Sequence, residues 1–165
     1  MIKVDHAGEH GAINIYLAQR AACHWRALSL VPELDEFLSH ERRYRALFAS
    51  ELARRSHRRC RSYHLFAIGG ATLGLVTGLI GPRAVHATTA AIEQVVLDHL
   101  QEQCATLAAS DPEAVDVISE IIADEQAHHD AASSQLGGRR SALDRVIYKV
   151  VEISTEAVIW LGMKL

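Results

Sequence analysis

Residues 118–132, with the sequence ISEIIADEQAHHDAA, decide the fold of this chain. Isoleucine and alanine recur there every three or four residues, which is the spacing of a helix with one apolar face. Glu125 falls within that face, because isoleucines stand three, four and seven residues before it. His128 follows at i+3, so one helix would offer a carboxylate and an imidazole from the same side. The stretch therefore predicts a helix whose buried face carries groups able to bind a metal.

The same helical spacing continues through the rest of the chain. Apolar residues and turn signals predict six helical segments, at about 4–28, 33–59, 65–80, 83–109, 112–136 and 141–164. Runs of alternating polar and apolar residues, which would indicate strands, are missing. Only 5% of the 165 residues are aromatic and three are proline, which also favours helix over sheet. We expect one all-α domain over residues 1–165, a four-helix bundle with accessory helices at 65–80 and 141–164.

Each of the other long segments also carries a glutamate within its apolar face. These are Glu9, Glu41 and Glu93, and each has apolar neighbours three or four residues away. Four isolated carboxylates buried in one bundle would be prohibitively unstable unless they were protonated or neutralised by a cation. We therefore interpret Glu9, Glu41, Glu93 and Glu125 as ligands of metal ions.

The spacing of the four glutamates indicates an internal repeat. Glu9 precedes Glu41 by 32 residues (41 − 9 = 32), and Glu93 precedes Glu125 by the same interval (125 − 93 = 32). The second pair repeats the first with an offset of 84 residues (93 − 9 = 84). At about 1.5 Å per residue, each half fits a helical hairpin that brings its two glutamates to one level. Two such pseudo-repeats, about 1–60 and 83–137, would place four glutamates around one point.

The ligand types point to a di-iron carboxylate bundle. Such bundles take one Glu from each of two helices and a Glu-x-x-His unit from each of the other two. Glu125 and His128 form one such unit. Hard carboxylates with imidazole suit iron or manganese better than a metal that prefers thiolate. Asp124, four residues before His128, either orients the second ring nitrogen of that histidine or stays in solvent.

One ligand position departs from the symmetrical pattern. The offset of 84 residues maps His128 onto Tyr44, so a phenol stands where a second histidine is expected (128 − 84 = 44). Tyr44 either coordinates ferric iron, hydrogen-bonds a metal-bound water or packs in the core. Alternatively another histidine replaces the ligand, and His6, one turn before Glu9, is better placed for this than His40. The last alternative is a weakened or single-metal site.

A basic run followed by an apolar segment indicates contact with a membrane. Residues 42–61 contain eight arginines and only one acid, Glu51. The apolar stretch 65–80 follows directly and is short for a spanning helix, which needs about 20 residues. Its glycines recur every fourth residue from Gly70 to Gly78, a spacing that permits close approach of helices. We expect arginines on anionic headgroups and an apolar helix dipping into one leaflet, or else a buried helix or dimer contact beside a solvated basic face.

Several motifs are shared with a known family. They are the opening stretch 4–12 (VDHAGEHGA), His40-Glu41, the glycine-rich apolar segment, the stretch 91–93 (AIE) and the stretch 124–130 (DEQAHHD). Over essentially the whole chain, the sequence resembles the demethoxyubiquinone hydroxylases, the di-iron monooxygenases of ubiquinone biosynthesis. The resemblance implies a ferritin-like fold, with iron ligands at Glu9, Glu41, Glu93, Glu125 and His128. Tyr44 takes the remaining ligand position, which is a histidine in the family.

The resemblance also implies an activity and its surroundings. The family uses molecular oxygen to hydroxylate a polyprenylated benzoquinone, so we expect two irons per chain, oxygen as co-substrate and a quinone lipid as substrate. Expected partners are the membrane surface, a lipid-binding accessory protein and further copies of the chain. The expected location is the cytoplasmic face of a bacterial inner membrane or the matrix side of the mitochondrial inner membrane. The net charge of −3 gives no reason to expect nucleic acid.

Two other functions are compatible with the same residues. A ferritin-like bundle that oxidises and stores iron would use the same carboxylates without turning over a quinone. A diverged relative whose metal site is impaired at Tyr44 would bind lipid or quinone without catalysis. The iron content of the chain distinguishes these alternatives.

Overall fold

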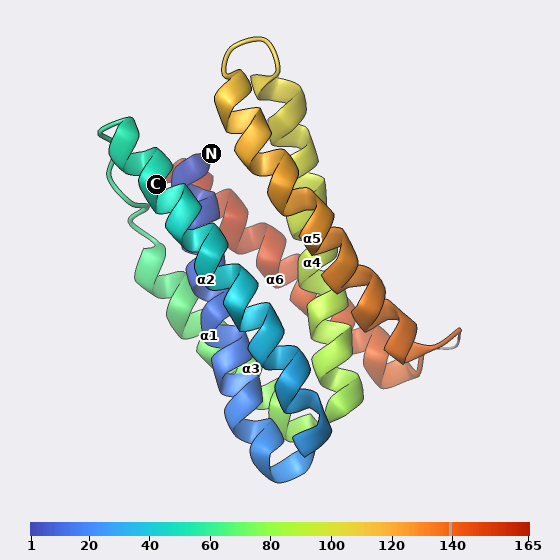
Figure 1. Ribbon diagram of the computed structural model, residues 1–165. Coiled ribbons are helices and arrows are strands. Elements are labelled where there is room, and N and C mark those ends of the chain that lie inside the picture. Colours follow the sequence, from blue (N-terminus) through green and yellow to red (C-terminus); the bar gives the residue numbers. More distant parts are fainter. Residues whose placement is uncertain (139) are drawn as a thin grey trace. The chain divides into compact units, whose positions relative to one another are not determined.

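The computed structural model describes residues 1–138 and 140–165, and over these residues the chain forms six α-helices and one short 3-10 helix. The elements are α1 (Ile2–Arg26), η1 (Leu28–Leu30), α2 (Val31–Arg54), α3 (Tyr63–Ile80), α4 (Pro82–Leu107), α5 (Pro112–Leu136) and α6 (Ala142–Lys164) (Figure 1). The all-α prediction is confirmed. The chain divides into two compact units, residues 1–85 with 157–165 (unit 1) and residues 86–156 (unit 2). Each unit holds one of the two glutamate pairs.

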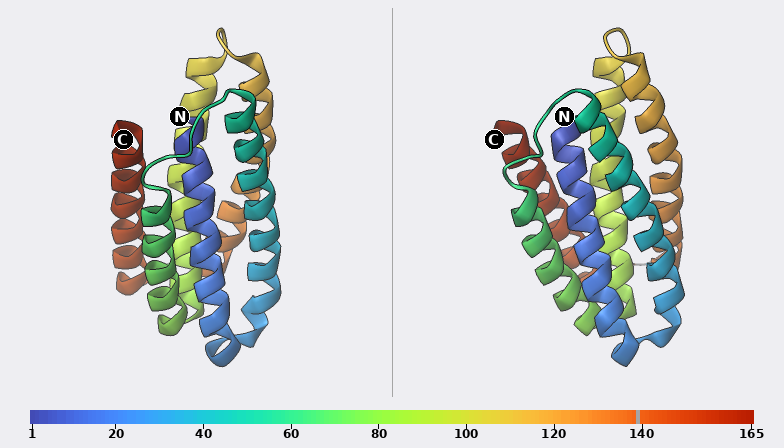
Figure 2. Two further views of the ribbon diagram at one scale, coloured as in Figure 1. Left: turned by 90° about the vertical axis from the view of Figure 1, so that its left-hand side faces the viewer. Right: turned by 60° about the vertical axis from the view of Figure 1, so that its left-hand side comes forward.

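In unit 1, helix α1 packs against both α2 and α3, and Figure 2 shows it with α3 on one side and α2 on the other. The rings of Tyr16 in α1 and Phe37 in α2 lie 5.5 Å apart, measured between centroids. On the other side, Gln19 Nε2 of α1 donates a buried hydrogen bond of 3.0 Å to Thr77 Oγ1 of α3. This hydrogen bond gives a buried donor its partner, and it helps to fix the register of the two helices.

Glycines allow α3 to approach α1 closely. A Cβ atom added at Gly70 would lie 2.4 Å from the carbonyl oxygen of Gly11, and one at Gly74 would lie 2.2 Å from that of Ile15. Both distances are far below van der Waals contact, so no larger residue fits at these positions. The glycine spacing in the sequence thus correctly predicted a close helix contact, and the contact partner is α1.

The end of α2 differs from the sequence-based expectation. The helix was expected to continue to about residue 59, and the arginines of this segment have a high helix propensity. It ends instead at Arg54, and Ser56 adopts a left-handed conformation with a φ of 53°. The chain then turns so that Cys60, which is buried, packs with Val4 and Phe66. A tertiary contact of Cys60 therefore overrides the local helical propensity of the arginine-rich segment.

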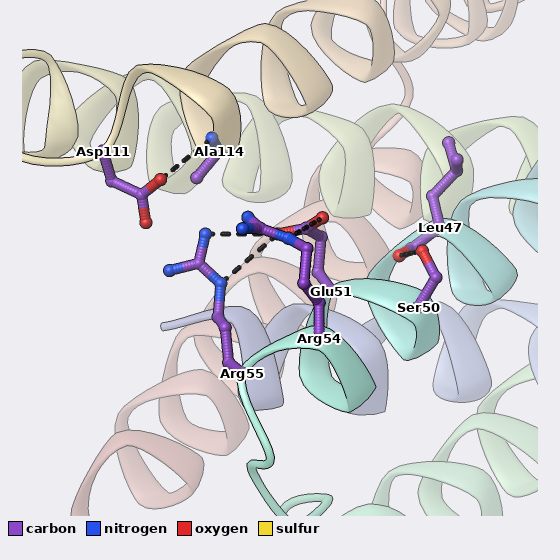
Figure 3. Close-up of polar contacts among 7 residues, drawn as sticks. All are labelled: Leu47, Ser50, Glu51, Arg54, Arg55, Asp111 and Ala114. Atoms are coloured by element: carbon purple, nitrogen blue, oxygen red, sulfur yellow. Dashed lines mark hydrogen bonds and ion pairs between the residues drawn. The ribbon is translucent and has the colours of Figure 1, made fainter.

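In unit 2, α4 and α5 form a hairpin and lie side by side (Figure 1). At one end of this unit a small apolar cluster joins three helices, with residues Ala87, Ala90, Ala132, Leu136, Ile147 and Tyr148. Helix α5 begins at a capped position, because Asp111 Oδ1 accepts a hydrogen bond of 3.2 Å from the backbone N–H of Ala114 (Figure 3). Pro112 occupies the first turn. A capping aspartate followed by proline in the first turn stabilises the start of a helix.

Helix α3 presents an apolar face to solvent. Six of its side chains are between 45% and 66% exposed, namely Leu65, Ile68, Leu75, Val76, Leu79 and Ile80. By helical geometry this face lies nearly opposite the glycines that contact α1. Among the described residues, α3 is the one helix long and apolar enough to cross a membrane by length and composition. Core helices of soluble proteins can be equally long and apolar, but those helices are mostly buried, whereas most of α3 is not.

Candidate metal centre

Three of the predicted site residues lie together in unit 2. Glu93 comes from α4, whereas Glu125 and His128 come from α5, and each offers one ligand atom within 4.8 Å of the others. The i, i+3 spacing on α5 places Oε2 of Glu125 3.5 Å from Nδ1 of His128. One helix therefore supplies two ligand atoms, and the neighbouring helix of the hairpin supplies a third.

The three side chains are buried within apolar faces. The exposed fractions of Glu93, Glu125 and His128 are 2%, 1% and 4%. The buried apolar residues on the same helix faces are Ala90, Leu97, Leu100, Ile118 and Ile121. The spacing of apolar residues predicted that Glu93 and Glu125 lie on apolar helix faces, and in unit 2 these faces are buried. Water that would otherwise solvate the carboxylates is excluded from this cluster.

Burial and proximity together favour a bound cation. Two ionised carboxylates that approach each other in an apolar interior repel, unless a proton or a cation neutralises them. Two carboxylates and one imidazole are hard and borderline ligands, which suit iron or manganese, and the cluster contains no thiolate. The residues of the cluster therefore fit iron.

The other three predicted residues are buried in unit 1. Glu9 lies on α1 and is 5% exposed, while Glu41 and Tyr44 lie on α2 and are 2% and 1% exposed. The Tyr44 hydroxyl accepts a hydrogen bond of 3.2 Å from Nη2 of Arg43, whose guanidinium carbon lies 5.0 Å from the centre of the phenol ring. Tyr44 is thus held by a neighbouring cation. The joint binding of metal by residues of the two units stays a prediction.

The histidines near Glu9 stack on an aromatic residue that the sequence analysis did not single out. The rings of His6 and His10 lie 5.0 Å and 4.1 Å from that of Tyr63, measured between centroids. Nη1 of Arg45 lies 3.4 Å from Nδ1 of His10. Burial, followed by the positive charge of Arg45, lowers the pKa of both histidines. The i, i+4 spacing of the histidines was visible in the sequence, whereas the contacts with Arg45 and Tyr63 come from distant segments.

Comparisons with known proteins identify the family. The model of the family described as ubiquinone biosynthesis protein COQ7 matches residues 1–162. The 3-demethoxyubiquinol 3-hydroxylase of Rhodospirillum rubrum is 29% identical over 161 residues, covering 98% of this chain and 75% of that protein. Two mitochondrial proteins are named NADPH-dependent 3-demethoxyubiquinone 3-hydroxylase. The Dictyostelium discoideum protein is 29% identical over 99% of this chain and 76% of its own length. The Homo sapiens protein is 31% identical over 79% of this chain and 61% of its own length. The chain therefore belongs to the ubiquinone biosynthesis protein COQ7 family of ferritin-like helical proteins.

Proposed function

We propose that this chain is a 3-demethoxyubiquinol 3-hydroxylase, a monooxygenase that hydroxylates a polyprenyl benzoquinone in ubiquinone biosynthesis. The observation that carries the proposal is the family match over residues 1–162. The buried cluster of Glu93, Glu125 and His128 supports it, because an oxygen-activating site needs metal ligands away from bulk water. Relatives that match nearly the whole chain are named as hydroxylases of this substrate.

The proposed ligands of two irons are Glu9, Glu41, Glu93, Glu125 and His128, with Tyr44 at the sixth position. The repeated 32-residue interval between glutamates supports the inclusion of the unit 1 residues. Bound iron would supply the redox chemistry that lets molecular oxygen react with an organic substrate. The protein contributes the arrangement of the carboxylates, the orientation of His128 beside Glu125, and the exclusion of water.

The proposed substrate is a lipid, and the surface of unit 1 suits contact with a membrane. The exposed apolar face of α3 follows directly on an arginine-rich segment. In that segment Glu51 accepts hydrogen bonds from Arg54 (2.8 Å) and Arg55 (3.1 Å) (Figure 3). Arg58, Arg59 and Arg61 are exposed. Exposed arginines beside an apolar helix favour peripheral binding to anionic lipids. We place the chain on the inner face of a bacterial inner membrane or the matrix face of the mitochondrial inner membrane.

The proposal is tested by assaying the purified chain for quinone hydroxylation. The iron-loaded chain is incubated with demethoxyubiquinol in detergent or vesicles, with oxygen and NADPH or a chemical reductant, and the product is measured by mass spectrometry. We expect a product heavier by one oxygen atom, and labelled oxygen gas should place the label in that product. The variant Glu125→Gln should abolish the product, whereas Glu120→Gln, at an exposed glutamate of the same helix, should leave it unchanged.

Three outcomes would contradict the proposal in different ways. Full iron loading without hydroxylated product would reject the hydroxylase assignment. Rapid oxidation of ferrous iron without quinone turnover would favour iron oxidation and storage. Iron content near zero after anaerobic reconstitution would favour a lipid-binding relative that has lost the metal.

A further inference from the structure

Helix α6 has two different apolar faces, and only one of them packs against the rest of the chain. On the packed face Val151 is buried, and Ile147, Tyr148, Val158 and Ile159 pack against buried apolar clusters. On the other side lies a row of exposed residues, here called the α6 stripe, made of Leu143, Val146, Val150, Ile153, Ala157 and Trp160. Five of these side chains are large apolar groups that are 53% to 62% exposed. Soluble monomeric proteins rarely expose an apolar row of this length to solvent.

The spacing of the α6 stripe is that of a coiled coil. Successive members are three, four, three, four and three residues apart (146 − 143, 150 − 146, 153 − 150, 157 − 153 and 160 − 157). This is the a and d pattern of a heptad repeat, which forms a narrow seam for one partner helix. A helix that rests on a lipid surface needs no such narrow seam, because its apolar face contacts many fluid chains at once.

The stripe is self-complementary when two copies run antiparallel. The pairs Leu143 with Trp160, Val146 with Ala157 and Val150 with Ile153 all add to 303, so each a position faces a d position of the other copy (143 + 160 = 146 + 157 = 150 + 153 = 303). Each layer then combines a large side chain with a smaller or branched one. A twofold axis between Val150 and Ile153 would generate the whole contact from one stripe, as an isologous interface requires.

The charges beside the stripe fit the same pairing. Lys149 and Glu156 both occupy the position that precedes an a residue, and in an antiparallel pair these positions face each other across the seam. Lys149 of one copy would therefore meet Glu156 of the other, twice by symmetry. Both side chains are exposed, and Lys149 pairs with Glu152 on its own helix. Opposite charges that flank the seam favour this orientation.

The charge balance of α6 argues against a lipid surface as its partner. The helix carries three acidic residues, Asp144, Glu152 and Glu156, and three basic ones, Arg145, Lys149 and Lys164. Helices that bind anionic membranes are rich in lysine and arginine on the polar face. The apolar face of α3, by contrast, follows an arginine-rich segment with Glu51 as its only acid between residues 42 and 61. The two exposed apolar faces thus suit different partners.

We propose that the α6 stripe binds the α6 stripe of a second copy of this chain, in an antiparallel two-helix contact. The contact is separate from the proposed iron ligands, so failure of the hydroxylase assay leaves it standing. The full chain in sedimentation equilibrium should then show a species of twice the 18.1 kDa chain mass that dissociates on dilution. Val150→Glu should shift the mass to that of one chain. Leu75→Glu, at an apolar residue of α3 that is also largely exposed, should leave the mass at that of two chains.

Charge exchange tests the flanking pair. Lys149→Glu places two acids opposite each other and should weaken association at least tenfold. The double variant Lys149→Glu with Glu156→Lys should restore it. Circular dichroism melting would check that the variants remain folded, which is expected because each altered side chain is exposed.

Cross-linking tests the orientation. In a Cys104→Ser background, the pair Leu143→Cys with Trp160→Cys should form a disulfide-linked dimer on oxidation. Leu143→Cys alone should not, because residues 143 of the two copies would be roughly 25 Å apart, at about 1.5 Å per residue. A chain that is monomeric at all concentrations, a dimer insensitive to Val150→Glu, or efficient linkage by Leu143→Cys alone would each overturn the proposal. So would loss of vesicle binding in Val150→Glu without any change in mass.

Discussion

Helices α2 and α5 occupy equivalent places in the internal repeat, yet they offer a metal different groups. Glu41 in α2 corresponds to Glu125 in α5, and both are almost completely buried. Three residues later α5 carries His128 beside its glutamate, whereas α2 carries Tyr44, whose hydroxyl accepts a hydrogen bond from Arg43. The repeat therefore preserves the buried carboxylate but not its imidazole partner. At these equivalent positions the side chains are buried in both helices, but the groups they offer to a metal differ.

The ends of α2 and α5 also differ, in their capping and in their backbone conformation. Helix α5 begins with a side-chain cap from Asp111 and is followed by Gly137, whose φ of 71° is accessible to glycine without strain. Helix α2 has Leu30 at its N-cap position, where no side chain caps the helix, and Ser56 beyond its other end has a φ of 53°. Local interactions thus define α5 at both ends, whereas α2 depends more on tertiary packing.

The largest effect is expected from the removal of His128 on α5. Even residues that only orient a metal ligand affect affinity about 10- to 100-fold, so His128→Ala should weaken iron binding by more than about 100-fold. The measurement is an iron titration against a competing chelator. His129→Ala is the matched control, since His129 lies on the same helix and contacts Asp130. Equal effects of the two substitutions would show that His128 is not a ligand.

A smaller effect of opposite sign is expected on α2. Tyr44→His restores the Glu-x-x-His pattern of α5 and should raise iron affinity or the rate of quinone hydroxylation by about tenfold. Tyr44→Phe, which keeps the ring and removes the oxygen, separates packing from ligation. A visible absorption band that disappears in Tyr44→Phe would identify phenolate bound to ferric iron. If iron binding and turnover are unchanged in both variants, Tyr44 does not contribute to the site.

The helix ends should respond to substitution by about 1 kcal/mol. Gly137→Ala places a Cβ in a left-handed conformation and should lower the free energy of unfolding by about 1 kcal/mol. Ser56→Gly removes that strain beyond α2 and should raise it by up to about 1 kcal/mol. Urea unfolding of the metal-free chain measures both changes. A loss of stability in Ser56→Gly would mean that the contacts of Ser56 outweigh its backbone strain.

The smallest effect is expected from the ion pairs in the last turn of α2. Hydrogen bonds from Arg54, and then from Arg55, hold the pKa of Glu51 below its ordinary value of 4.5 (Figure 3). A lowered folded-state pKa stabilises the protein above pH 4.5, and this contribution is lost as the pH falls through the folded-state value. Glu51→Gln should therefore cost about 0.5 kcal/mol at pH 7 and almost nothing at pH 3. A cost independent of pH would assign the effect to packing.

Periodicity was sufficient to predict those features that depend on neighbours in sequence. The apolar faces around Glu93 and Glu125 follow from spacings of three and four residues. The early end of α2 did not follow, because it depends on the packing of Cys60 against residues far away in the chain. The stacking of Tyr63 on two histidines of α1 was missed for the same reason. The spacing of apolar residues predicts which face of each helix is buried. It does not predict contacts between residues that are far apart in the sequence.

The most direct test of the account is the iron content of the purified chain, measured by mass spectrometry of the metal together with protein concentration. If buried carboxylates from both halves of the repeat are neutralised by iron, wild-type protein should bind two irons per chain, and Glu125→Gln should lose them. Equal iron content in Glu125→Gln and wild type would contradict this claim. So would a wild-type chain that folds stably but binds no iron.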